Sequence, residues 1–223
     1  MALKLRPPGT NILGAFSFGL KDGPDLGDEY APNSSYHLPT YAVSVEDLAN
    51  LGAGQSNGAG QNAGAGQNNA AGLNIDGVAK EVSWQCLALC KNGTVVVGEV
   101  TPRNQAPRPA GHAFDGPVRM TSLSQGPIID GIFKNAVDLA NIKEELGQKF
   151  GLTDEYEPRV LKIPGLLVTA IWLKSQAAGG ADWIVPLHTK IDDLQKEPLV
   201  TMEKFLEITQ SLAKARLASP IFD

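Results

Sequence analysis

The sequence predicts an α+β fold: a mostly antiparallel sheet of four or more strands, built from two hairpins, packed with two main helices and joined to a coil-rich N-terminal arm. Three patterns indicate this fold. An Asn-Gly turn joins two runs of β-type residues, and a second pair of β-type runs flanks a Gly/Ala loop. Each pair is followed by a segment with apolar residues at helical spacing.

The arm is expected over residues 1–51, because turn-forming residues dominate its first 40 positions and leave one short apolar stretch at 12–20. Near its end, Ser44 is placed to cap a short helix over 44–51. Asp47 would be the third helical residue, where a carboxylate suits the positive end of the helix dipole. Gly52 then ends this helix.

Residues 52–72 contain a six-residue repeat, written GAGQSN, GAGQNA and GAGQNN, with a degenerate echo after it. A period of six also occurs in parallel β-helices, but each coil of that fold needs an aliphatic residue inside, and these units offer nothing larger than Gln. Such a composition buries too little apolar surface to offset the entropy of ordering. The tract is therefore predicted to be a disordered linker, and residues 73–223 to be the α+β core domain.

The first hairpin is predicted from runs at 82–90 and 94–100. With Asn92 and Gly93 as a two-residue loop, Cys90 would pair with Val95 and Cys86 with Glu99. Both faces of this hairpin are largely apolar, which predicts a sheet covered on both sides.

A proline-punctuated loop follows at 101–117, and then the first main helix, expected from residue 128 to residue 150. The second β region runs over 159–174, with a break at Pro164-Gly165. A further strand at 181–187 is predicted to form a hairpin with it, which would bring Trp172 and Trp183 near each other. The second main helix is predicted at 201–217. Its inward residues would be Met202, Phe205, Leu206, Ile208, Leu212 and Leu217.

Composition and charge disfavour several classes of protein. The net charge is −5, so no basic field is available to neutralise a phosphate backbone, and nucleic acid is not an expected partner. Two prolines interrupt the start before an apolar signal segment can form, and the longest apolar run, 166–173, is too short to cross a bilayer. We therefore expect no membrane partner and a cytoplasmic location, which two cysteines without a disulfide framework also favour.

Cys86 and Cys90 are the first candidates for chemistry. On a strand their Cα atoms would stand about 13 Å apart, too far for a disulfide or for one shared zinc ion. Buried, unreactive thiols are the simplest expectation. The alternative is a nucleophilic cysteine assisted by His112 or His188, although Glu99 opposite Cys86 would disfavour the thiolate.

Other polar residues suggest binding at most. His37, His112 and His188 are isolated, and no metal-binding or cofactor motif appears, so no cofactor is expected. The acidic stretch at 22–29 departs from the spacing of a calcium loop and is expected to be solvated, as are Asp154, Glu155 and Glu157. Arg103, Arg108 and His112 lie in the proline-rich loop, where they could bind an anion or an acidic peptide.

The function expected from these features is that of a soluble, non-enzymatic binding or interaction protein, with a protein partner contacted by the tethered arm. The alternative is a thiol-dependent hydrolase using Cys86 or Cys90 with a histidine, and a third possibility is a small-ligand binder using the proline-rich loop. The sequence leaves the partner and the oligomeric state open.

Overall fold

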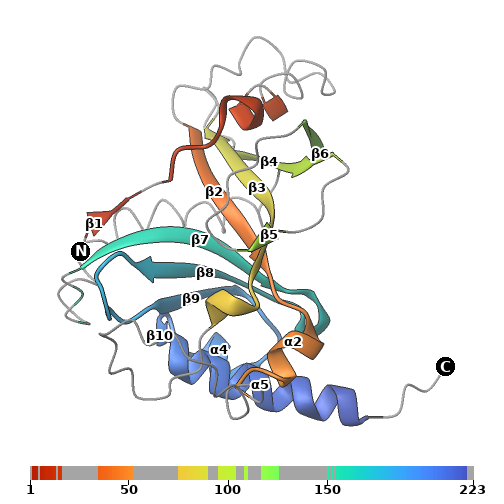
Figure 1. Ribbon diagram of the computed structural model, residues 1–223, viewed down its shortest axis with the longest axis vertical. Helices are drawn as coiled ribbons and strands as arrows, with labels where there is room; N and C mark the ends of the chain where they lie inside the picture. Colours follow the sequence, from red (N-terminus) through yellow and green to blue (C-terminus); the bar gives the residue numbers. More distant parts are fainter. Residues whose placement is uncertain are drawn as a thin grey trace, which may run out of the picture.

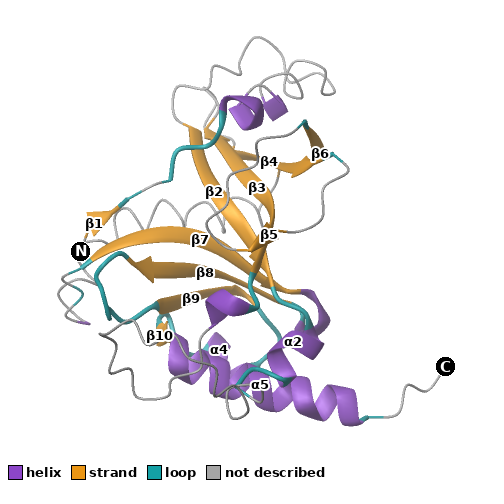
Figure 2. Ribbon diagram, viewed as in Figure 1, coloured by secondary structure: helices purple, strands orange, loops and turns teal. Residues whose placement is uncertain are grey.

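The computed structural model describes residues 2–4, 6–13, 15–16, 35–52, 75–89, 95–103, 108–109, 117–125, 150, 152 and 154–219. They form one sheet and a few helices (Figures 1 and 2). The strands are β1 (Ala2–Leu3), β2 (Ser35–Ala42), β3 (Lys80–Leu89), β4 (Val95–Pro102), β5 (Arg108–Pro109), β6 (Val118–Gln125), β7 (Glu155–Ile163), β8 (Val168–Ser175), β9 (Trp183–His188) and β10 (Val200–Thr201). The helices are α2 (Val45–Ala49), η1 (Ile75–Gly77), η2 (Pro164–Leu166), α4 (Asp192–Gln195) and α5 (Met202–Ala218), and residues 10–13 and 15–16 are also helical.

The strands follow the order β10-β9-β8-β7-β2-β3-β4-β6, with β1 beside β7 and β5 beside β3. Every neighbouring pair is antiparallel except β2 with β7 and β1 with β7, which are parallel. The predicted α+β class and mostly antiparallel sheet are therefore confirmed, but the sheet is larger than the two predicted hairpins. Of the two main helices, α5 is present, and residues 128–149 of the other lie outside the described residues.

The first hairpin forms, but its predicted register is wrong by one residue. Leu89 pairs with Val95, the last pair within the described residues, whereas the predicted two-residue turn would pair Cys90 with Val95. Cys86 consequently lies opposite Gly98, and Glu99 turns to the other face of the sheet, because a slip of one residue reverses every side chain. There Glu99 accepts hydrogen bonds from Ser83 at 2.6 Å and Lys162 at 3.1 Å.

Residues 35–52 contribute a strand to the sheet and the helix α2. β2 lies between β3 and β7 in the middle of the sheet, and Tyr41 and Leu48 are fully buried. This strand is hard to predict from the sequence because it contains Pro39, and proline is unusual in a central strand. Pro39 is tolerated because it comes just before Thr40, the first residue of β2 that pairs with β7. The division of the chain into domains stays a prediction, and residues 53–74 lie outside the described residues.

Ser44 caps α2 as predicted, since its hydroxyl accepts a hydrogen bond from the Asp47 amide at 3.0 Å. The second β region is also present, with β7 starting earlier than expected and η2 at the Pro164-Gly165 break. Trp172 pairs with Ile184 and Leu173 with Trp183, so the two tryptophans lie on adjacent strands but on opposite faces.

Helix α5 covers one face of the sheet at its β7–β10 end (Figure 2). Met202, Phe205 and Leu206 are buried as predicted, whereas Leu212 and Leu217 are 38% and 48% exposed. Thr209 and Ala213 take the inward positions in this half of the helix. The prediction failed at Leu212 because the buried stripe of this half passes through a polar and a small residue, which apolar spacing does not reveal.

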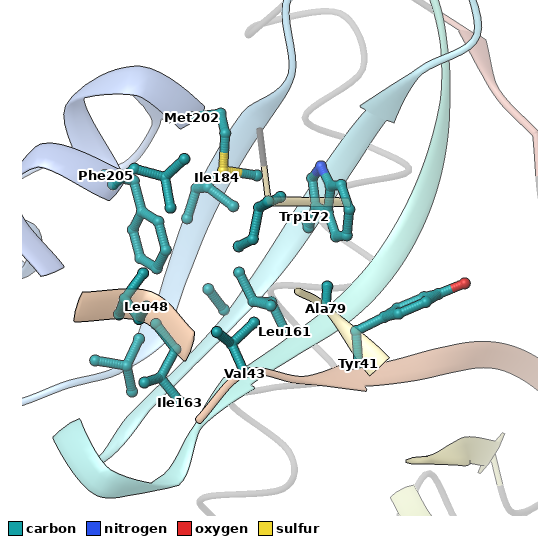
Figure 3. Packing of buried hydrophobic residues seen from close by; sticks show 14 of the residues in the cluster. Tyr41, Val43, Leu48, Ala79, Leu161, Ile163, Trp172, Ile184, Met202 and Phe205 are labelled. Atoms are coloured by element: carbon teal, nitrogen blue, oxygen red, sulfur yellow. The ribbon is translucent and has the colours of Figure 1, made fainter. Parts of the chain in front are cut away.

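Two apolar clusters lie on this face of the sheet. The α5-side cluster is built on β7, β8 and β9 and packs against α2 and α5 (Figure 3); its largest members are Tyr41, Leu48, Leu161, Ile163, Trp172 and Phe205. The N-terminal cluster is built on β3 and β4 and is covered by residues 12–16; its members are Ile12, Phe16, Trp84, Cys86, Ala88 and Val100. A third cluster, which includes Leu38, Leu87, Val160 and Leu173, lies on the opposite face. Among the described residues, no helix is long and apolar enough to cross a membrane.

Replacing Gly98 with alanine tests the packing of the N-terminal cluster. A Cβ at Gly98 would lie 2.6 Å from the Phe16 ring, so we expect a loss of about 1–3 kcal/mol in the free energy of unfolding, measured with urea. Gly77→Ala is the matched control, because a Cβ there meets nothing within 4 Å. Equal stability of the two variants would show that Phe16 does not rest on β4.

Candidate functional site

The most densely connected polar groups of the described structure form a band between the two apolar clusters. We call this band the polar strip; its members are Arg6, Tyr41, Asp76, Glu81, Glu157, Arg159, Lys174 and Asp182.

A β-bulge in the pairing of β2 with β3 places Glu81 in the polar strip. Pro39 pairs with Trp84 and Tyr41 with Glu81, so two residue steps on β2 match three on β3. Because of the extra residue, Glu81 and Trp84 face the same side of the sheet.

Glu81 is the centre of the upper part of the strip. Its side chain is fully buried. One carboxylate oxygen, Oε1, accepts from the Trp84 indole at 2.9 Å, and the other, Oε2, accepts from the Tyr41 hydroxyl at 3.1 Å. Figure 3 shows the Tyr41 hydroxyl pointing away from the α5-side cluster. These two neutral donors satisfy part of the hydrogen-bonding capacity of the carboxylate, but they do not balance its charge.

Arg6 supplies the compensating charge. Its Nη2 donates to Glu81 Oε2 at 2.6 Å, and its Nη1 donates to the Tyr41 hydroxyl at 3.3 Å. The guanidinium carbon also lies 4.7 Å from the centre of the Trp84 ring, within the range of a cation–π interaction. The Arg6 side chain is 20% exposed, so the guanidinium closes the buried carboxylate from the solvent side.

Arg159 anchors the lower part of the strip. Its guanidinium carbon lies 4.9 Å from the Tyr41 ring centre and 4.8 Å from the Trp172 ring centre. Its Nε donates to Glu157 at 2.8 Å, and the side chain is only 9% exposed. Tyr41 thus contacts Arg159 through its ring and Arg6 through its hydroxyl, and so joins the two parts.

Lys174 and Asp182 complete the strip at the β8–β9 hairpin. Lys174 donates to Asp76 at 2.6 Å and to Asp182 at 3.2 Å. Asp182 also accepts from the Trp172 indole and from the Ser175 amide, each at 2.9 Å. One carboxylate therefore fixes the orientation of Trp172 and holds the turn between the two strands.

The surroundings shift several pKa values in the strip. Burial raises the pKa of Tyr41 to about 12, which keeps its hydroxyl protonated as a donor. Burial alone would lower the pKa of Arg6, but the hydrogen bond to Glu81 and the charges of Tyr41, Glu81 and Glu157 together outweigh it, and the net pKa is raised. The pKa of Lys174 is raised in the same way, since its contacts with Asp76 and Asp182 outweigh desolvation.

The structure separates Cys86 from His188, two of the residues expected to form a thiol site. Cys86 is a buried free thiol, and burial raises its pKa to about 12. His188 is exposed on β9, which is separated from β3 by β8, β7 and β2. Four strand spacings of about 4.8 Å place the two strands about 19 Å apart.

Sequence reasoning missed the histidine that does lie beside Cys86. His37 pairs directly with Cys86 across β2 and β3, so their side chains share one face of the sheet. The Phe16 ring lies edge-on to the His37 ring with centroids 6.0 Å apart, and desolvation lowers the pKa of His37. Desolvation thus disfavours both the thiolate of Cys86 and the imidazolium of His37.

The structure does not describe several of the predicted site residues. Cys90, His112 and the acidic stretch at 22–29 lie outside the described residues, and for Arg108 only the β5 backbone is described. Arg103 is exposed beside β4. Glu157 is not the solvated surface charge expected, because it pairs with Arg159 and is 13% exposed. Within the described ranges, no group of three or more His, Cys, Asp and Glu side chains could hold a metal ion.

Removing the Asp182 carboxylate should test the lower part of the strip. Asp182→Ala leaves the buried Trp172 indole and the Ser175 amide without their acceptor, so we expect a loss of about 2–4 kcal/mol in the free energy of unfolding. Asp193→Ala, at an exposed aspartate of α4, is the control and should cost no more than about 0.5 kcal/mol. Similar losses in urea titrations of both variants would contradict a structural role for Asp182.

Comparisons with known proteins give no function for this site. No family model, no curated protein and no solved structure matches the chain. What the site does is therefore inferred from its own geometry.

Proposed function

We propose that this chain is a non-enzymatic binding or interaction protein that recognises a segment of polypeptide on the face of its sheet. The observation that supports this proposal is the way the sheet holds the chain's own residues 2–16. β1 pairs with Glu155 and Tyr156 of β7, Arg6 inserts into the polar strip, and Ile12 and Phe16 cover β3 and β4. Backbone pairing combined with a charged anchor and apolar anchors is how folded domains bind peptides.

The shape of the sheet favours such binding. On one edge of β7, residues 160–162 pair with β2, and residues 155–156 pair with β1. β2 therefore leaves β7 before residue 159, and Figure 1 shows β2 and β3 rising away from β7 and β8. The N-terminal segment contacts both halves of the sheet, because β1 pairs with β7 and Ile12 and Phe16 pack on β3 and β4. We propose a protein partner, since the net charge of −5 opposes nucleic acid, and a cytoplasmic location, which suits the free Cys86 thiol.

A fluorescent peptide with the sequence of residues 1–16 tests the proposal. In the full-length chain the same segment already occupies the sheet, so the peptide should bind weakly. Phe16→Ala weakens that internal contact, and fluorescence anisotropy should then show binding at least about tenfold tighter than to the unchanged chain. A scrambled peptide is the control. If neither protein distinguishes the peptide from its scrambled form, the binding proposal is wrong.

The rival proposal, a thiol-dependent hydrolase, has one observation in its favour, the placement of His37 beside Cys86. A pKa of about 12 for Cys86, against an ordinary value of 9.0, would lower the thiolate fraction near neutral pH about 1,000-fold.

Iodoacetamide labelling discriminates the two proposals. In a Cys90→Ser chain, native Cys86 should react at least about 1,000 times more slowly than after unfolding in urea, because burial opposes both the thiolate and the reagent. The Cys86→Ser chain reports on Cys90 alone. Rapid native labelling of Cys86 would favour the hydrolase.

A further inference from the structure

We infer that Glu81, Tyr41 and Trp84 form a guanidinium-binding site, filled in this structure by Arg6 of the same chain, which an arginine side chain of a partner segment fills when residues 2–16 are displaced. This inference rests on the proposed binding function and names the side chain that the partner must present. It depends on features of the site that exist without Arg6.

The three groups of the site come from β2 and β3, and the Glu81 carboxylate is fully buried while Arg6 is in place. Trp84 and Tyr41 donate to opposite oxygens of Glu81 at 2.9 and 3.1 Å, and this geometry is set by the bulge and by burial in the sheet. A fully buried carboxylate that accepts only from neutral donors is strongly destabilised unless a cation joins it. The site is therefore prepared for a positive charge from whichever chain supplies it.

The geometry selects guanidinium over ammonium. Glu81 Oε2 and the Tyr41 hydroxyl stand 3.1 Å apart, and Arg6 donates to the first from Nη2 and to the second from Nη1. Two neighbouring acceptors match the planar fork of a guanidinium, while the Trp84 ring 4.7 Å from its carbon offers a stacking face. A lysine ammonium has three donors and could bond both acceptors, but it lacks the planar fork that matches their spacing and stacks on the Trp84 ring.

Chemical rescue of the full-length Arg6→Ala chain tests the site. The variant should melt about 5 °C below the unchanged protein, because Glu81 loses its cation. Methylguanidinium at about 20 mM, well below denaturing concentrations, should recover a measurable part of this loss and exceed the effect of methylammonium. Arg216→Ala, at an exposed arginine of α5, is the control and should show neither the loss nor the recovery.

Two outcomes would overturn the guanidinium site. One is an equal response of Arg6→Ala and of Arg6→Ala/Glu81→Gln to methylguanidinium, since the double variant has no buried anion. The other comes from Arg6→Lys, which keeps the charge and should melt below the unchanged protein because the fork is lost. A melting temperature equal to that of the unchanged chain would contradict guanidinium selection even if Arg6→Ala fails to fold.

The peptide experiment separates this inference from the function on which it rests. The Phe16→Ala chain should bind the peptide of residues 1–16 at least about tenfold more tightly than the same peptide carrying Arg6→Ala. Equal binding of the two peptides would keep the binding function and reject the role of arginine. Binding of neither peptide, together with rescue by methylguanidinium, would leave the site as a purely internal contact and reject its use by a partner.

Discussion

The buried carboxylate of Glu81 is the constraint on which the arrangement of this fold depends. A charged carboxylate without access to water is stable only with hydrogen-bond donors and a cation around it. Glu81 has them from three separate parts of the chain: Tyr41 of β2, Trp84 of β3 and Arg6 of the N-terminal segment. One buried charge thereby fixes the bulged pairing of β2 with β3 and the path of residues 2–16 across the sheet.

Tyr41 extends this constraint into the rest of the core. Its ring packs against Trp172 in the α5-side cluster, with centroids 5.7 Å apart, while its hydroxyl reaches Glu81. Arg159 lies against both rings, and Trp172 is in turn held by Asp182. The polar strip is thus continuous with the apolar packing on both sides, and its aromatic rings give its cations a low-polarity surface to stack on.

Local signals in the sequence predicted local structure well. The Asn92-Gly93 turn located a hairpin, Ser44 located a helix start, and apolar spacing located α5. Register was not predictable in the same way, because an alternation of apolar residues on both faces of β3 fits two pairings equally well, and the structure has the one that places Cys86 opposite Gly98. The position of β2 was hidden for a related reason, since its proline argued against a central strand.

The polar strip was the least predictable feature, because its members are scattered from Arg6 to Asp182 and share no motif. Only the sheet order and the bulge bring them together.

Arg6 belongs to the same chain as the site that it fills, and this attachment bears on the proposed function. A segment attached to its own chain competes with a partner at an effective concentration on the order of millimolar. Under the proposed function, a partner present at lower concentration would therefore need a higher intrinsic affinity than the N-terminal segment itself.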